Sequence, residues 1–184
     1  MKSLKKKIVE KSKDNSDYEI FFFDESRFGT HSNIGHGWFP TGVRTQVPVS
    51  LGFKNFYIYS AVSSCTGDNF HLMLPSVDTG CMNAFLQEFG LQFANKKIFL
   101  VVDGASWHKS SELVIPANIN FIFLPAYSPE LNPVERLWEY IKDNVLKNKV
   151  YNSIKLLEEC VCDFIGKITK DQIKSTCACS YLYT

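Results

Sequence analysis

Several features of other protein classes are missing from this sequence, and each absence excludes a class. No apolar run is long enough to span a bilayer, because a membrane-spanning helix needs about 20 consecutive apolar residues. No apolar segment follows the lysine-rich N-terminus, which excludes a typical secretory signal peptide. No internal repeat or low-complexity segment is present. We therefore expect an intracellular protein without a membrane partner, located in the cytoplasm or at the nucleoid if its source is bacterial.

Excess charge of one sign is also missing, since the formal net charge is +1 at pH 7. A strongly basic chain would point to nucleic acid by its charge alone, whereas here such a role has to depend on local positive charge. The most basic segment is the tail of residues 1–17, which contains six lysines. We expect this tail to be solvated, with a phosphate-contacting arm or a linker as the alternatives.

The paired C-x-x-C spacing of a zinc site is absent from the six cysteines, which are Cys65, Cys81, Cys160, Cys162, Cys177 and Cys179. The two C-x-C pairs, at 160–162 and 177–179, are only a weak metal signal. Cys160 falls on the apolar face of a predicted helix, which favours a buried thiol. In an intracellular protein, we expect all six cysteines to be reduced.

The composition is that of an ordinary globular domain. Apolar residues make up 45% of the chain and charged residues 21%, which argues against disorder. A chain of 184 residues is long enough to bury one substantial core. We therefore predict a single folded domain over residues 18–184, after the basic tail at 1–17.

Short apolar runs bounded by turn residues predict the strands, at 18–24, 43–49, 55–63, 69–74, 97–103 and 120–124. The run at 18–24 is apolar on both faces, as is typical of a central strand. Apolar stripes predict helices after Asp78 or Thr79, after Asn132, and after Ser153, which caps the last one. Because strands and helices alternate in the second half, we predict an α/β fold with a mixed sheet of about five strands flanked by helices.

The segment 121–142 delivers a carboxylate to a fixed place. A short apolar run predicts a buried strand, and the prolines that follow prevent a helix until Asn132. We expect Asn132 to be the N-cap, Pro133 the first helical residue and Glu135 the third. The structural alternative for Glu135 is a capping box, in which its side chain bonds back to the N-cap amide.

Two more acids occupy comparable positions, since Asp24 and Asp103 each end an apolar strand. Alone, each is equally well explained as a turn or cap residue. Together with Glu135 they suggest a shared role, and divalent metal binding is the obvious one. Glu25 adjoins Asp24, but successive strand residues point to opposite faces, and we choose Asp24. Convergence of the three acids at one edge of the sheet is the ribonuclease-H-like layout.

Four strings of the sequence resemble a known family. They are FFFDESRFG (21–29), HGWFPTGVRTQVP (36–48), VVDGASWHKS (101–110) and LPAYSPELNPVERLW (124–138). They resemble the catalytic domain of mariner-type and related bacterial insertion-sequence transposases, the DDE endonucleases, from about residue 18 to about residue 165. The resemblance implies that Asp24, Asp103 and Glu135 are the catalytic, metal-binding residues. The 32 positions between Asp103 and Glu135 fall within the family's usual range.

The resemblance also implies the reaction and its partners. The implied reaction is DNA transposition: metal-dependent strand cleavage, followed by attack of the freed 3′-hydroxyl on target DNA. The implied cofactors are two Mg²⁺ or Mn²⁺ ions per site, for which carboxylate oxygens are suitable hard ligands. The implied partners are the double-stranded DNA of transposon ends and target, bound by a homodimer. Two alternatives stay open, namely a nuclease that only hydrolyses and a catalytically impaired remnant acting as a DNA-binding or assembly module.

The family pattern is not matched at the N-terminus. Family members usually carry helix-turn-helix regions before the first Asp, and only about twenty residues precede Asp24. We therefore expect the chain to be a fragment or one half of a split reading frame.

Accessory residues are predicted around the three acids. His108 is a candidate for orienting a metal ligand or contacting phosphate, with a surface histidine as the alternative. The candidate DNA contacts are Lys109, Arg136, Lys142, Lys147 and Lys149, although charged residues on a helix are usually its solvated face. Trp38, Trp107 and Trp138 are expected to pack in the core or at its rim, with base stacking as the alternative.

Overall fold

Strand β1 (Tyr18–His31) lies at the centre of a mixed five-stranded sheet, as its two-sided apolar run predicted. The computed structural model describes residues 17–31, 41–42, 51–126 and 128–179. The sheet order is β3-β2-β1-β4-β5, with the other strands at Leu51–Val62 (β2), Asn69–Leu74 (β3), Lys97–Val102 (β4) and Ile119–Phe123 (β5). The first three strands pair antiparallel, whereas β4 and β5 run parallel to β1. The predicted mixed sheet is confirmed.

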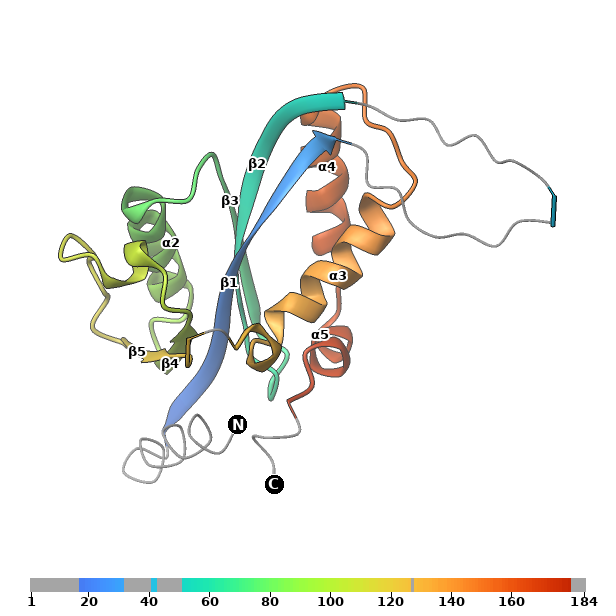
Figure 1. Cartoon of the computed structure of the whole chain (residues 1–184). Coiled ribbons are helices and arrows are strands. Elements are labelled where there is room, and N and C mark those ends of the chain that lie inside the picture. Colours follow the sequence, from blue (N-terminus) through green and yellow to red (C-terminus); the bar gives the residue numbers. More distant parts are fainter. Residues whose placement is uncertain (1–16, 32–40, 43–50, 127, 180–184) are drawn as a thin grey trace.

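Helices cover both faces of the sheet (Figure 1). Helix α2 (Thr79–Gln92) lies on one face, while α3 (Val134–Val145), α4 (Ile154–Ile165) and α5 (Lys170–Thr176) lie on the other. Two short 3₁₀ helices, η1 (Ser106–Lys109) and η2 (Pro129–Leu131), follow β4 and β5. Within the described residues, no helix is both long and apolar enough to cross a bilayer.

Alternate side chains of β1 enter two separate apolar clusters, because successive strand residues face opposite sides of a sheet. Phe21 and Phe23 pack in the cluster under α2. Phe22 and Phe28 pack in the cluster under α3, α4 and α5. All four rings are fully buried, and each contributes about 1.5–3 kcal/mol of burial energy. β1 is therefore held rigidly from both sides.

Two predicted boundaries are wrong. β1 does not end at Asp24, because it pairs with β2 through Gly29 and continues to His31; Glu25 is therefore a strand residue. The helix capped by Ser153 is not the last one, because α5 follows it. The prediction missed α5 since this short helix buries only Ile173, although its capping box of Thr169 and Gln172 was visible in the sequence.

The remaining predictions concern helix α2, the cysteines and segments outside the described residues. The α2 stripe is confirmed, since Met82, Phe85, Leu86, Phe89 and Phe93 are all buried, and Asp78 is the N-cap. No disulfide joins the six cysteines, all of which lie within the described residues; that they are reduced in the cell stays a prediction. The basic segment 1–16, most of the block 36–48 with Trp38, and the predicted strand 43–49 lie outside the described residues.

Candidate active site

Asp24 projects from the middle of β1 toward the α3 face of the sheet. It follows the alternation set by Phe22, which is buried on that face. Its Oδ2 atom accepts a hydrogen bond of 2.8 Å from the indole Nε1 of Trp138 on α3. Trp138 is 2% exposed, so the predicted core packing is confirmed, with this additional polar contact. The contact holds the Asp24 carboxyl beside α3.

Glu135 lies in the first turn of α3, which is attached to β1 by Asn132. The buried amide of Asn132 donates from Nδ2 to the carbonyl of Phe23 over 2.9 Å, while its Oδ1 accepts from the Val134 amide over 3.2 Å. The helix begins one residue later than predicted, with Pro133 and not Asn132 at the N-cap. Pro133 makes no side-chain cap bond, so the capping-box alternative for Glu135 is not observed, and Glu135 is exposed.

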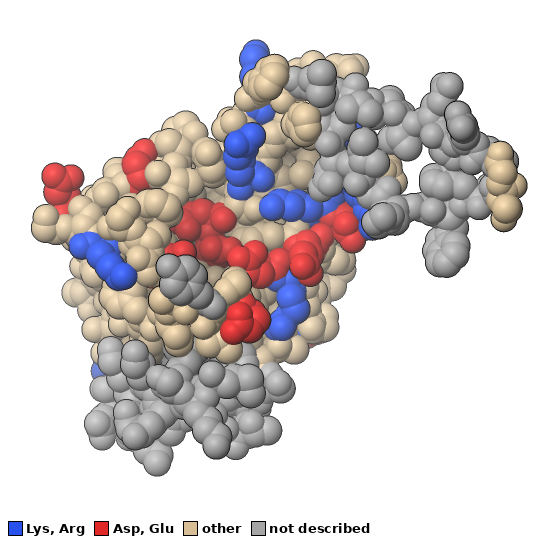
Figure 2. Space-filling model, viewed as in Figure 1, with Lys and Arg blue, Asp and Glu red and all other residues tan. Residues whose placement is uncertain are grey.

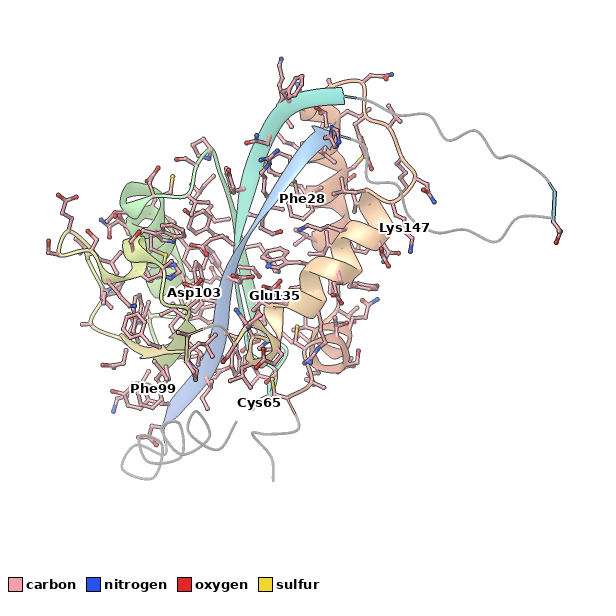
Figure 3. All side chains as sticks on the ribbon, viewed as in Figure 1. Phe28, Cys65, Phe99, Asp103, Glu135 and Lys147 are labelled. Carbon is pink, nitrogen blue, oxygen red and sulfur yellow. The ribbon has the colours of Figure 1, made fainter. Side chains whose placement is uncertain are left out.

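A cavity of about 420 Å³ brings the three predicted acids together, with Asp24, Asp103 and Glu135 all among its lining residues. The rest of the lining comes from Gly104 and Ala105 after β4 and from the proline-rich segment between β5 and α3. Figure 3 shows Asp103 and Glu135 on opposite sides of β1. In Figure 2, acidic side chains form a band across the middle of this face, bordered by lysine and arginine. Elements distant in sequence thus build one acidic site.

The carboxyl of Asp24 is strongly perturbed. Burial, reinforced by the negative charge of Glu135, raises the pKa of Asp24 to about 8. The hydrogen bond from Trp138 acts in the opposite direction, because it favours the charged form, but it is outweighed. Without a cation, Asp24 is therefore mostly protonated at neutral pH.

Asp103 has the opposite electrostatic setting. It directly follows β4, its side chain is 51% exposed, and its Oδ1 atom lies 2.6 Å from Nδ1 of His108. The same oxygen accepts a 3.0 Å hydrogen bond from the Ala105 amide. The hydrogen bond to His108 holds the pKa of Asp103 below its usual range. Asp103 is therefore an ionised carboxylate with one oxygen fixed.

His108 is not a surface histidine, since it is 2% exposed. Its Nδ1 contacts Asp103, and its Nε2 lies 3.0 Å from Oε1 of Glu25. Burial alone would lower the pKa of His108, but the hydrogen bonds to Asp103 and Glu25 outweigh burial and raise it to about 9. With a pKa of about 9 the ring is an imidazolium at neutral pH, in which both nitrogens are hydrogen-bond donors.

Glu25 is the residue that sequence reasoning set aside. The alternation that turns Asp24 to α3 turns Glu25 to the α2 face, where Oε1 also accepts a 3.0 Å hydrogen bond from the indole of Trp107. Its side chain is 7% exposed. A signal was present, because a strand that continues past Asp24 places a carboxylate on each face.

The predicted cationic contacts separate into two groups. Lys142, half-buried, is electrostatically coupled to Glu135 and Asp24, and burial lowers its pKa; its amine lies 5.6 Å from the ring centre of Phe28. The Lys109 charge acts on Asp103. The others have partners away from the cavity: Arg136 donates to the carbonyls of Thr176 and Ala178, Lys147 pairs with Asp143, and Lys149 donates to the carbonyl of Asn144.

The donor set of the cavity suits a hard divalent cation, because it consists of carboxylate oxygens from three elements. The raised pKa of Asp24 also fits, since a buried carboxyl beside a second acid is one that a nearby cation would ionise. Within the described residues, no three His, Cys, Asp or Glu side chains already form a group that holds an ion. The residues present thus fit such a cation in kind, through the carboxylates of Asp24, Asp103 and Glu135.

Comparison with known proteins extends these observations. A family model described as DDE superfamily endonuclease matches residues 19–158. The uncharacterized protein y4pE/y4sA of Sinorhizobium fredii is 41% identical over 96 residues, which cover 52% of this chain and 71% of the relative. The insertion element IS630 uncharacterized 39 kDa protein of Shigella sonnei is 27% identical over 160 residues, 84% of this chain and 47% of the relative. This chain thus spans about half the length of the Shigella protein.

Solved structures share the fold at low sequence identity. The catalytic domain of Mos1 mariner transposase superposes with a TM-score of 0.65 at 14% identity, over 96% of this chain and 84% of that one. The Mos1 mariner paired end complex with Mn has a TM-score of 0.68 at 15% identity, and the Mos1 strand transfer complex 0.68 at 16%. In both, 96% of this chain matches 56% of the other. The predicted ribonuclease-H-like fold is confirmed. With the family model matched over most of its length, the chain belongs to the DDE superfamily endonucleases.

Proposed function

We propose that this chain is the catalytic domain of a transposase, which cuts DNA and joins the resulting 3′-hydroxyl to target DNA. The observation that carries the proposal is the shared cavity of Asp24, Asp103 and Glu135, which come from β1, the end of β4 and α3. Belonging to the DDE superfamily endonucleases supports phosphoryl transfer as the reaction class.

Asp24, Asp103 and Glu135 are the residues that would hold two Mg²⁺ or Mn²⁺ ions. When bound, such ions supply positive charge that polarises the phosphoryl group and activates the attacking water. The likeness to Mos1 complexes crystallised with Mn and with Mg supports this choice of metals. Asp24 must give up its proton when an ion binds, since its pKa is about 8.

The cleavage step balances as a hydrolysis. Water oxygen bonds to phosphorus, the bond from phosphorus to the 3′ oxygen breaks, and the proton released by water reaches the departing oxygen through solvent. In the second step the oxygen of that 3′-hydroxyl bonds to a target phosphorus, the bond from that phosphorus to the target's own 3′ oxygen breaks, and the hydroxyl proton reaches the departing oxygen through solvent. The chain contributes by holding the reacting groups in place, which is the main source of catalysis in phosphoryl transfer.

Positive charge from the protein supports phosphate binding at the same cavity. Lys142 is coupled to both Asp24 and Glu135, and Lys109 acts on Asp103. The N-terminus of α3, a helix of 12 residues, adds a partial positive charge beside Glu135. We therefore propose Lys109 and Lys142 as the DNA contacts, ahead of the three cations that have other partners.

The proposed partners are the double-stranded ends of a transposon and the target DNA, bound by a homodimer. The support is the shared fold with Mos1 transposase in complexes described as paired-end and strand transfer. This chain spans 56% of those chains. The proposal therefore covers only the contacts that the catalytic domain itself makes with the transposon end.

Single replacement of Asp24, Asp103 or Glu135 by Ala tests the proposal. We expect each folded variant to lose Mn²⁺-dependent nicking of supercoiled plasmid to below about one hundredth of the parent rate, since a metal-holding carboxylate is removed. Asp171→Ala, an exposed acid remote from the cavity, is the matched control and should match the parent. If a folded variant keeps the parent rate, the replaced residue is not one of the metal-holding residues.

Two further measurements separate the alternatives. Calorimetric titration with Mn²⁺ should give binding that Asp24→Ala loses; a parent that binds no Mn²⁺ and nicks no DNA is the impaired remnant. Incubating a labelled duplex that ends in a free 3′-hydroxyl with plasmid tests joining. Nicking without any joined product would identify a nuclease that only hydrolyses.

A further inference from the structure

Glu25 connects the strand that carries Asp24 to the loop that carries Asp103. One oxygen of Glu25, Oε1, accepts 3.0 Å hydrogen bonds from both Trp107 and His108. His108 in turn contacts Asp103 over 2.6 Å through its other ring nitrogen. Since Glu25 directly follows Asp24 in the chain, two of the three cavity acids are linked through one imidazole ring.

The ring at the centre of this link has little freedom to move. The side chain of His108 is 1% exposed, and its ring packs edge-on against Phe23, with 5.5 Å between ring centres. Its backbone amide bonds to the carbonyl of Ala105, which closes the loop after β4. A ring held at both nitrogens and by an aromatic neighbour has one orientation.

Asp103 depends on that orientation more than its neighbours do. Its side chain is 51% exposed, and it directly follows a strand, so its rotation is not restricted by close packing. Its two hydrogen bonds come from His108 and from the Ala105 amide, both within the loop that His108 closes. The direction of the Asp103 carboxylate is therefore decided by where His108 is held.

We propose that Glu25 is a positioning residue, which fixes the Asp103 carboxylate for metal binding by anchoring His108 to β1. This proposal rests on the proposed function, because it assigns Glu25 a role at the same cavity. Glu25 itself does not line the cavity; it faces the opposite side of the sheet from Asp24. Residues that orient metal ligands in this way are typically worth 10- to 100-fold in metal affinity or activity.

The test combines a readout that needs no metal with one that does. In the metal-free protein, the ring N–H signals of His108 in ¹H–¹⁵N NMR should show a strong hydrogen bond to Asp103 that Glu25→Ala weakens or loses. By calorimetry, Glu25→Ala should bind Mn²⁺ roughly 10- to 100-fold more weakly than the parent. Glu25→Gln keeps an oxygen in the same place for both donors, so its affinity should stay within about threefold of the parent.

Asp68→Ala is the matched control for a loss of stability. Asp68 is a comparably buried acid, paired with Lys96 and Lys170 far from the cavity, and its loss should lower the melting temperature without changing Mn²⁺ affinity. If Glu25→Ala does not fold, Glu25→Asp shortens the side chain by one carbon and should weaken Mn²⁺ binding in a folded protein.

The outcomes distinguish this inference from the proposed function. Unchanged His108 signals in Glu25→Ala, or parent-like Mn²⁺ affinity when Asp24→Ala has lost binding, would overturn the positioning role alone. An equal loss of affinity in Asp68→Ala would overturn it as well, because the effect would then follow stability. A parent that binds no Mn²⁺ would refute the proposed function, while the NMR comparison would still decide whether Glu25 holds His108.

Discussion

Two neighbouring carboxylates on β1, Asp24 and Glu25, have opposite settings although they differ by one position. Each accepts a hydrogen bond from a tryptophan indole, Asp24 from Trp138 on α3 and Glu25 from Trp107 on η1. Only Glu25 also meets a cationic ring, that of His108. Asp24 instead lines the cavity with a second acid, Glu135, and burial with that acid raises its pKa to about 8.

The two faces of β1 therefore give a carboxylate two different charge environments. On the α2 face the carboxylate is neutralised by a partner inside the protein, and the group is complete as it stands. On the α3 face, no cationic side chain among the described residues contacts the Asp24 carboxylate, so its charged form is unfavourable until a cation arrives. Buried groups of the second kind cost stability and are typical of functional sites.

Asp24→Asn should show this cost most clearly. The folded pKa of about 8 lies above the ordinary value of 3.8, so the folded state retains a proton that the unfolded state loses. The contribution of Asp24 to the stability of the metal-free protein therefore falls as pH rises from about 4 to about 8. Asn removes that fall, and at pH 7 the variant should be more stable by roughly 1–4 kcal/mol.

Urea unfolding of parent and variant at pH 4.5, 6 and 8, with a chelator present, measures the effect. The gain should grow with pH. A variant no more stable than the parent at pH 8 would mean that Asp24 carries no such cost. Glu25→Gln, measured in parallel, should be no more stable than the parent at any pH, because it removes a charge that His108 balances.

A second comparison isolates the effect of a carboxylate partner on a buried histidine. Nδ1 of His71 on β3 is hydrogen-bonded to Ser60 Oγ, and its buried Nε2 has no hydrogen-bond partner among the residues that the structure describes. Burial lowers the pKa of His71 to about 4, whereas that of His108, held by two carboxylates, is about 9. NMR titration should find His71 neutral and His108 protonated throughout pH 5–8.

The lowered pKa of His71 should also make its contribution to stability depend on pH. The unfolded state protonates His71 below the ordinary pKa of 6.5 and the folded state only near 4, so stability is lost as pH falls through this interval, by roughly 1–3 kcal/mol in total. His71→Gln should flatten that part of the pH profile. An unchanged slope between pH 6.5 and 4 would show that His71 is not its source.

A third comparison concerns the two indoles, and it includes the smallest expected effect, that of Trp107→Phe. Trp138→Phe removes a donor to Asp24 and leaves unfilled volume in the core, and it should cost roughly 1–3 kcal/mol. Trp107→Phe acts at a half-buried position, where His108 still bonds to Glu25, and it should cost less, about 1 kcal/mol or below. Thermal unfolding of both variants checks the order, and a larger loss for Trp107→Phe would contradict it.

Much of the site was readable from local pattern. The two-sided apolar run predicted that β1 is central, and the apolar ends at Asp24 and Asp103 placed both acids at the sheet. The prolines before Glu135 predicted its place at the start of α3, with an error of one residue at the N-cap. Such features depend on residues within one turn or one strand, where sequence spacing directly sets direction.

Other features depended on contacts that spacing does not encode. The ring of His108 joins Glu25 to Asp103, although His108 and Glu25 are 83 positions apart in the chain. Arg136 donates hydrogen bonds to the carbonyls of Thr176 and Ala178. These bonds depend on the position of α5, a helix that was not predicted. Partners of this kind meet only when separate elements pack together.

The sequence by itself determined that Asp103 follows a core strand and that Glu135 begins a helix, which face of β1 each carboxylate takes, and that the sheet is mixed. Alternation along a strand and the backbone limits of proline are local, and they act before any packing. Only the tertiary structure decided that Asp24 is buried beside Glu135 while Glu25 is paired with His108. The reason is that charge and desolvation are set by what the other elements bring within a few ångströms, and those elements are distant in the chain.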